Sequence, residues 1–162
     1  MTKVRKLDKV LQYIFHKNEI SEMHLGLLLE ILYLSDWKAA IEKDGDTISD
    51  LKWQKINSSP KAENITKLLS KIRDIQVSKF SPDEENWLIK MVHPKASNSL
   101  GKTDKLIIDY VSDLSKNSES LESLVGYTYP MFIISDEQTP INMSKLAKDY
   151  KKYVKPKLQQ YA

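Results

Sequence analysis

One stretch of the chain has residues that could bind the phosphates of a nucleotide. Ala96–Thr103 (ASNSLGKT) fits the loose form of the phosphate-binding loop, in which backbone N–H groups and a Lys surround the phosphates. Ala96 replaces the first glycine, and the Ser- and Asn-rich sequence would curl around phosphates poorly. Roughly sixty residues follow Thr103, too few for several crossover units of about 30 residues each. We therefore interpret the segment as a loop in which Thr103 caps the next helix.

Residues that could bind a metal or catalyse a reaction do not form a recognisable pattern. The three histidines of the chain share no helix face at metal-ligand spacing. Asp44, Asp46 and Asp50 partly follow the odd positions of a calcium loop, but Lys55 stands where the loop needs Glu. No Ser, His and acid grouping can be placed. We predict a protein that is not an enzyme and has no metal and no other cofactor.

Aromatic residues beside a polar connection indicate either a protein-binding surface or a core. Trp37 and Trp53 flank the polar segment Asp44–Asp50, where burial on all sides is difficult. Aromatic side chains contribute much of the energy at protein interfaces, although they also fill cores, and both interpretations stay open here. An interface predicts that alanine at either Trp weakens partner binding and leaves the fold intact. The predicted partner-binding residues are Tyr33, Asp36, Trp37, Trp53, Asn57, Pro60, Tyr127 and Tyr129.

Length and composition indicate one α-rich domain. The chain has 162 residues, of which 41% are hydrophobic, which is enough for one domain over residues 1–162 with a real core. Only four glycines favour helices over tight-turned β architecture, and the absence of cysteine excludes disulfides and thiolate metal sites. The basic N-terminus has no apolar region typical of a secretion signal, and no apolar run reaches membrane length. These features predict a cytoplasmic protein that does not enter the membrane.

Positive charge is concentrated at the C-terminal end. Lys145–Ala162 contains six lysines and one acidic residue, a charge of +5, so the rest of the +3 chain is −2. Arginine, which reads DNA bases by paired hydrogen bonds, occurs only twice, which argues against sequence-specific DNA binding. The Lys145–Lys157 tail could bind an acidic partner or nucleic acid weakly. Pro156 interrupts the last helix, so residues 156–162 are expected to fray.

The most hydrophobic stretch predicts a buried helix around which the others pack. In Leu25–Leu34 only Gly26 and Glu30 are neither apolar nor aromatic, so a helix there has no face for water. Ser21 is its predicted N-cap, and Asp44-Gly45-Asp46 ends it near Lys43, because glycine tolerates a left-handed turn.

Hydrophobic periodicity predicts the other elements. A first helix spans Leu7 to about Asn18, and Ser59-Pro60 opens a helix that presents Ile65, Leu68, Leu69, Ile72 and Ile75 on one face. Trp87–Val92 is either a strand or part of a helix capped at Ser81, and this alternative stays open. Three later helices are predicted: Thr103–Lys116 with Leu106, Ile107, Tyr110, Val111 and Leu114 inward, Ser118–Tyr127, and Asn142–Lys155. The predicted fold is mainly α (α+β), with about six helices around the central one and a small β-hairpin or strand pair.

Several of these segments together resemble the Panacea antitoxin domain, also called the SocA-like antitoxin domain. The first block has Leu32-Tyr33 and Asp36 in an apolar helix, followed by Gly45, Trp53 and Pro60. The family's Tyr-Gly before that proline is absent. The second block resembles the family at Leu106–Tyr110, Ser120–Val125, Thr128, Pro130 and Thr139–Ile141, with Tyr129 in place of the family's His. The resemblance covers about Leu7 to Asp149.

The resemblance implies a helical fold with a small β element and a role in binding a toxin. Panacea domains neutralise unrelated toxins by direct contact, and some relatives deliver the toxin to a protease. The first expectation is therefore an antitoxin of a toxin–antitoxin system. The alternative is a non-catalytic adaptor or structural subunit of a multi-protein phage-defence complex.

Overall fold

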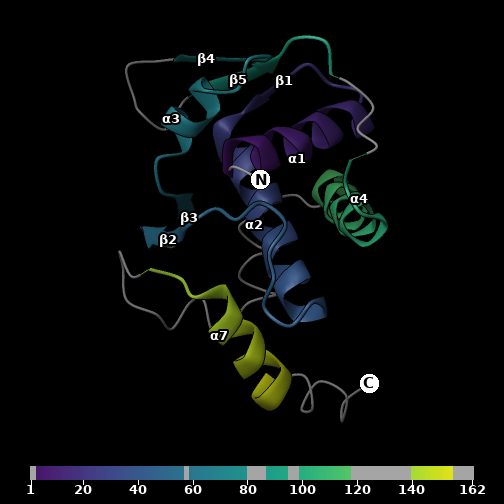
Figure 1. Ribbon diagram of the computed structural model, residues 1–162, viewed down its shortest axis with the longest axis vertical. Helices are drawn as coiled ribbons and strands as arrows, with labels where there is room; N and C mark the ends of the chain where they lie inside the picture. The colour runs from purple at the N-terminus through teal and green to yellow at the C-terminus, as the bar shows by residue number, and fades with distance from the viewer. Residues whose placement is uncertain (1–2, 57–58, 80–86, 95–98, 118–139, 155–162) are drawn as a thin grey trace.

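The structure is a computed structural model that describes residues 3–56, 59–79, 87–94, 99–117 and 140–154 (Figure 1). These residues form an α+β fold, as predicted in outline, although it has more β structure than one hairpin. The helices are α1 (Lys3–Lys17), α2 (Leu25–Glu42), α3 (Ile65–Ser70), α4 (Lys102–Asn117) and α7 (Met143–Asp149), followed by the π-helical turn η1 (Tyr150–Val154). The strands are β1 (Glu22–His24), β2 (Trp53–Ile56), β3 (Ser59–Ala62), β4 (Ile75–Lys79) and β5 (Trp87–Met91). The predicted helix at Ser118–Tyr127 lies outside the described residues.

Helix α2 is buried over most of its length, although Gly26 and Leu27 in its first turn are exposed and Glu30 is half-buried. Twelve of its residues are buried, and it contacts α4, α7, β1, β3 and β5. Its predicted start is wrong, because Glu22–His24 form a strand and His24, not Ser21, is the N-cap residue. Pairing with β5 places Met23 opposite Ile89, and both side chains are buried. Burial of this pair therefore outweighs the local capping preference of Ser21.

The strand alternative is the correct one for Trp87–Val92. Strands β1, β5 and β4 form an antiparallel sheet in that order, and Figure 1 shows it above α1 and α3. Ile75 lies in β4, not in the helix predicted from Ser59-Pro60. That helix prediction is wrong in its first part as well, since α3 begins only at Ile65 and is six residues long.

Strands β2 and β3 form a separate hairpin, and its register explains how Pro60 fits in a strand. Glu63 N–H donates to Lys52 C=O at 2.9 Å, so the pairs 52/63, 54/61 and 56/59 are the hydrogen-bonded ones. Lys55 and Pro60 form a non-hydrogen-bonded pair between them. The missing N–H of Pro60 would point away from β2, so the hairpin loses no hydrogen bond there.

The turn at Gly45, which follows α2, was predicted correctly. Glycine is needed there for two reasons, its backbone conformation and the closeness of α7. Its φ is +101°, and an added Cβ would lie 2.5 Å from Ser144 Oγ of α7. Gly45→Ala is therefore expected to lower the free energy of unfolding by more than the roughly 1 kcal/mol that backbone strain alone costs. The measurement is urea unfolding followed by circular dichroism.

Gly26 provides the matched control for that substitution. It lies in α2, and a Cβ added there would meet no atom within 4 Å, so Gly26→Ala should raise stability by about 0.5–1 kcal/mol. A Gly45→Ala protein as stable as wild type would show that α7 does not press against this turn.

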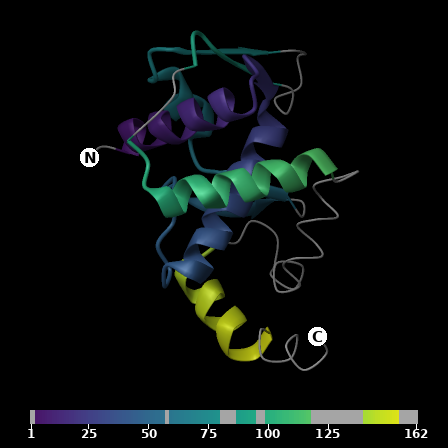
Figure 2. The same ribbon diagram turned by 90° about the vertical axis from the view of Figure 1, so that its right-hand side faces the viewer.

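Helix α4 lies beside α1 and α2 (Figure 2). Its buried face carries Ile107, Ile108, Val111 and Ser112, whereas Leu106 is 59% exposed and Tyr110 51% exposed. The predicted inward face is therefore wrong at Leu106 and Tyr110. A polar contact with the turn after α1 helps to set the rotation of the helix, because Asn18 Nδ2 donates to Ser112 Oγ at 3.3 Å.

A tyrosine–aspartate contact also joins α1 to α4. The Tyr13 hydroxyl donates to Asp109 Oδ1 at 2.6 Å, and burial, together with this carboxylate, raises the pKa of Tyr13 to about 12. Because the folded pKa exceeds the ordinary value of about 10, this stabilisation is complete below pH 10 and is lost as the pH rises toward 12. Absorbance titration should show that Tyr13 ionises late, as should the buried Tyr33, whose pKa burial also raises. In Asp109→Asn the pKa of Tyr13 should fall toward the ordinary value, and an unchanged titration would exclude the contact.

Candidate functional site

The residues predicted to bind a partner lie mostly inside the protein. Tyr33 and Asp36 are 0% exposed, Trp53 is 2% and Trp37 is 3% exposed, and Pro60 is also buried. The prediction of an exposed aromatic surface at these five residues is therefore wrong, and the core interpretation of the two tryptophans is the correct one. Asn57, Tyr127 and Tyr129 lie outside the described residues.

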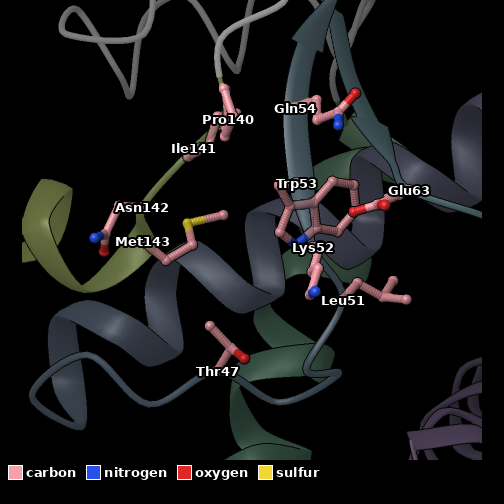
Figure 3. A pocket seen from close by; sticks show the side chains of 10 residues that line it. All are labelled: Thr47, Leu51, Lys52, Trp53, Gln54, Glu63, Pro140, Ile141, Asn142 and Met143. Carbon is pink, nitrogen blue, oxygen red and sulfur yellow. The ribbon is translucent and has the colours of Figure 1, made fainter.

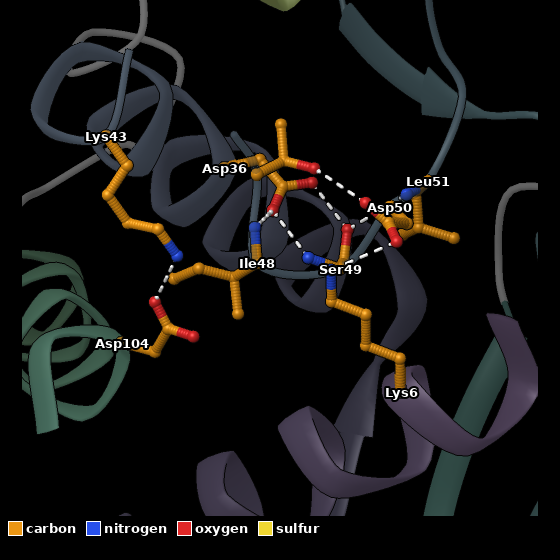
Figure 4. Close-up of polar contacts among 9 residues, drawn as sticks. Lys6, Asp36, Lys43, Ile48, Ser49, Asp50, Leu51 and Asp104 are labelled. Carbon is orange, nitrogen blue, oxygen red and sulfur yellow. Dashed lines mark hydrogen bonds and ion pairs between the residues drawn. The ribbon is translucent and has the colours of Figure 1, made fainter. Parts of the chain in front are cut away.

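Asp36 connects α2 to the segment that follows it (Figure 4). Its Oδ1 accepts hydrogen bonds from the backbone N–H groups of Ile48 and Ser49, both at 2.9 Å. Its Oδ2 accepts from Ser49 Oγ at 2.5 Å and from Trp53 Nε1 at 2.8 Å. Four donors thus hold one carboxylate, and together they fix the chain from Ile48 to the start of β2.

The surroundings of Asp36 act on its pKa in opposite directions. Burial raises the pKa of this carboxyl group, while hydrogen bonds from Ser49, Trp53 and Ile48 favour the ionised form and oppose the rise. Both oxygens are occupied by donors of its own chain, so the group has no free lone pair aimed at a substrate. Its geometry fits a structural role.

The aromatic residues of this region pack on one another. Tyr33 meets Trp53 edge to face, with ring centroids 5.3 Å apart, and Trp37 meets Tyr150 of η1 in the same way at 5.7 Å. Such geometry adds about 0.5–1.5 kcal/mol beyond the burial of area. Trp53 connects β2 to α2, because its Nε1–H donates to Asp36 and its ring contacts Tyr33.

A groove opens on the outer side of this cluster (Figure 3). It has a volume of about 430 Å³ and lies between β2 with its preceding loop and the start of α7. Ile141 N–H donates to Trp53 C=O at 2.9 Å and closes one end. The lining residues are Thr47, Leu51, Lys52, Trp53, Gln54, Glu63, Pro140, Ile141, Asn142 and Met143.

Of the residues that line the groove, only Trp53 was among the predicted site residues. Lys52, Gln54 and Glu63 become neighbours through the β2–β3 register, which the helix prediction at Ser59-Pro60 had hidden. Met143 reaches the groove from a helix some ninety positions farther along the chain. No local signal in the sequence indicates that contact.

The residues of the phosphate-loop-like and calcium-loop-like segments do not line this groove. Lys102 is exposed at the start of α4, and residues 95–98 of the phosphate-loop-like segment lie outside the described part. Asp44 pairs with Lys151 at 3.1 Å and Asp50 with Lys6 at 3.0 Å, and both are surface ion pairs. In the described ranges no three His, Asp or Glu side chains come together in a way that could hold a metal ion.

The basic C-terminal region is described only as far as Val154. Asn142 caps α7 by accepting a hydrogen bond from Lys145 N–H at 3.0 Å, so the predicted start of this helix is confirmed. Lys145, Lys148 and Lys152 are exposed. Weak binding of an acidic partner or nucleic acid by this region stays a prediction.

Among the described helices, none combines the length and the apolar character that a membrane crossing requires. Comparison of the chain with protein-family models, curated proteins and solved structures finds no match. The resemblance to the Panacea domain, and the antitoxin role it implies, therefore stay predictions.

Proposed function

We propose that this protein is a non-enzymatic antitoxin that neutralises a partner toxin in the cytoplasm by direct protein–protein contact. The proposal rests first on the order and spacing of the motifs that resemble the Panacea domain. The observation that carries it is the clustering of these motif residues. Tyr33 packs on Trp53, Asp36 bonds to Trp53, and Gly45 allows α7 to approach the end of α2.

Their clustering gives the sequence spacing a physical meaning. Residues that depend on one another for burial and hydrogen bonding must appear together in any chain that folds this way, so chance similarity at single positions explains the pattern poorly. The same clustering changes the role of these residues. They build the scaffold, and the partner must be bound by another part of the surface.

Co-expression with the product of the adjacent gene tests the proposal. If that product stops cell growth, the protein should restore growth, and the two purified proteins should elute together from a size-exclusion column. Growth arrest that the protein does not relieve would contradict the antitoxin role.

The composition of the purified complex distinguishes the adaptor function from the antitoxin function. An adaptor of a phage-defence system should co-purify with a large nuclease or ATPase and should not affect a toxic neighbour. A complex with one small toxic protein would favour the antitoxin.

A further inference from the structure

We propose that the outer face of α4 joins two copies of this chain into a symmetric dimer. The two α4 helices run antiparallel, and the two-fold axis crosses them halfway between Leu106 and Tyr110. This inference does not depend on the antitoxin function, because it concerns contacts between copies of the same chain.

Helix α4 exposes two large hydrophobic side chains to solvent. Among the described residues only three such side chains are exposed, namely Leu27 at 39%, Leu106 at 59% and Tyr110 at 51%. The last two are four positions apart on α4, which places them on the same face of the helix. Figure 2 shows α4 on the outside of the described fold, in front of α2. Adjacent exposed hydrophobic residues, unlike single scattered ones, indicate a contact surface.

A cation and an anion flank these two side chains on the same face. Lys102 is exposed one turn before Leu106, and Asp113 is exposed one turn after Tyr110. Positions 102, 106, 110 and 113 are spaced by four, four and three residues, so they form one stripe along the helix. The stripe therefore begins with a positive charge, has an apolar middle and ends with a negative charge.

Such a stripe is complementary to a second copy of itself in the antiparallel direction. At 1.5 Å rise per residue, Leu106 and Tyr110 lie about 3 Å on either side of the axis, so each faces the other residue in the second copy. Lys102 lies about 9 Å before the axis and Asp113 about 7.5 Å after it, so these two come within about 1.5 Å of the same level. The symmetry repeats both contacts. Parallel helices would instead place each charge level with its own equivalent, which is repulsive.

The remaining charged residues of α4 leave this complementarity intact. Lys116 lies about 12 Å from the axis and comes level with position 100 of the second copy, which is a leucine. Asp104, Lys105 and Asp109 each contact a residue of α1 or of the end of α2 within their own copy. No like charges therefore face each other along the stripe.

The ring of Tyr110 is oriented before any second copy binds. Lys38 Nζ lies 4.6 Å from the ring centroid, and it also pairs with Glu42 Oε1 at 3.0 Å. The cation keeps its counter-charge when the face is covered, so contact buries no unpaired charge here. A side chain that is already held in place loses less entropy on binding.

Sedimentation velocity of the full chain over a concentration series tests the dimer. One helix pair gives an interface at the small end of the known range, so association should depend on concentration, and the series extends to about 1 mM to detect a dissociation constant of that order. The wild type should form dimers. Leu106→Asp should weaken association about ten-fold or more, because it places a carboxylate against the ring of Tyr110. Leu27→Asp is the matched control on α2, outside the stripe, and should associate like the wild type.

Exchange of charges tests the antiparallel register. Lys102→Glu and Asp113→Lys should each weaken association about ten-fold or more, because like charges then meet at both ends of the stripe. An equimolar mixture of these two variants should associate as the wild type does, since the two changed charges face each other and so do the two unchanged ones. Lys116→Glu makes a charge change outside the ion pair and should have no effect.

Circular dichroism first establishes that every variant folds. A wild type that stays monomeric at about 1 mM, equal association of the wild type and Leu106→Asp, or a mixture that associates no better than its two components would each overturn the antiparallel α4 dimer. A monomeric wild type that loses only its contact with the toxin in Leu106→Asp would also overturn it, and would assign this face to the toxin instead.

Discussion

Asp36→Ala is expected to lower the free energy of unfolding by about 4 kcal/mol, because it leaves four buried donors without an acceptor. A buried polar group that loses its partner costs about 1–3 kcal/mol, and part of the total is recovered because a buried charge is also removed. Small domains are stable by only about 5–15 kcal/mol, so the loss is a large fraction of the whole. Urea unfolding followed by circular dichroism measures it.

A double-mutant cycle shows whether the loss comes from these bonds. Asp36→Asn keeps the shape of the side chain but turns an N–H donor toward the indole N–H of Trp53. The cost of Asp36→Asn should therefore be smaller in a Trp53→Phe background, which has no indole donor. Equal costs in both backgrounds, or an Asp36→Ala protein that unfolds at the wild-type urea concentration, would contradict the structural role of this carboxylate.

Trp37→Ala is expected to cost about 3–5 kcal/mol, because the side chain is 3% exposed and its removal leaves a cavity between α2 and η1. This reverses the expectation drawn from the sequence, in which alanine at Trp37 or Trp53 would spare the fold. Thermal and urea unfolding of the purified variant provide the measurement.

Two substitutions control for the loss of an aromatic ring. Trp87 is partly exposed in β5, so Trp87→Ala should cost clearly less, and Trp37→Phe should retain much of the packing against Tyr150. A Trp37→Ala protein with wild-type stability that no longer neutralises its partner would restore the interface interpretation.

Elements with a strong helical period could be predicted from sequence alone. The burial of Leu7, Val10, Leu11, Ile14 and Phe15 in α1 follows the spacing of these residues. The burial of most of α2 and the turn at Gly45 could also be predicted, because both depend on residues close together in the chain.

Elements that depend on distant partners could not be predicted. Strand β1 is three residues long and exists because Met23 pairs with Ile89, and β3 contains a proline that reads as the start of a helix. The exposed side of α4 was misassigned for the same reason, since contacts with Tyr13 of α1 and with Asn18, just after α1, set its rotation.

The role of Asp36 could be inferred only in part. The sequence does not separate Asp36 from Glu30 and Glu42 of the same helix, which are half-buried and exposed, but an acid that is buried in such a helix needs several donors. The polar segment after Gly45 contains the nearest backbone N–H groups that could supply them. The groove offers no comparable signal, because its walls come from parts of the chain that only the tertiary fold brings together.

The bonds to Asp36 also bear on the order in which the chain acquires its structure. They close loops of only 12 to 17 residues, whereas β1 must find β5 across more than sixty residues. Short loops lose less entropy on closure and form sooner. The unit from α2 to β2 can therefore assemble early and serve as a template, onto which the three-stranded sheet and α4 condense.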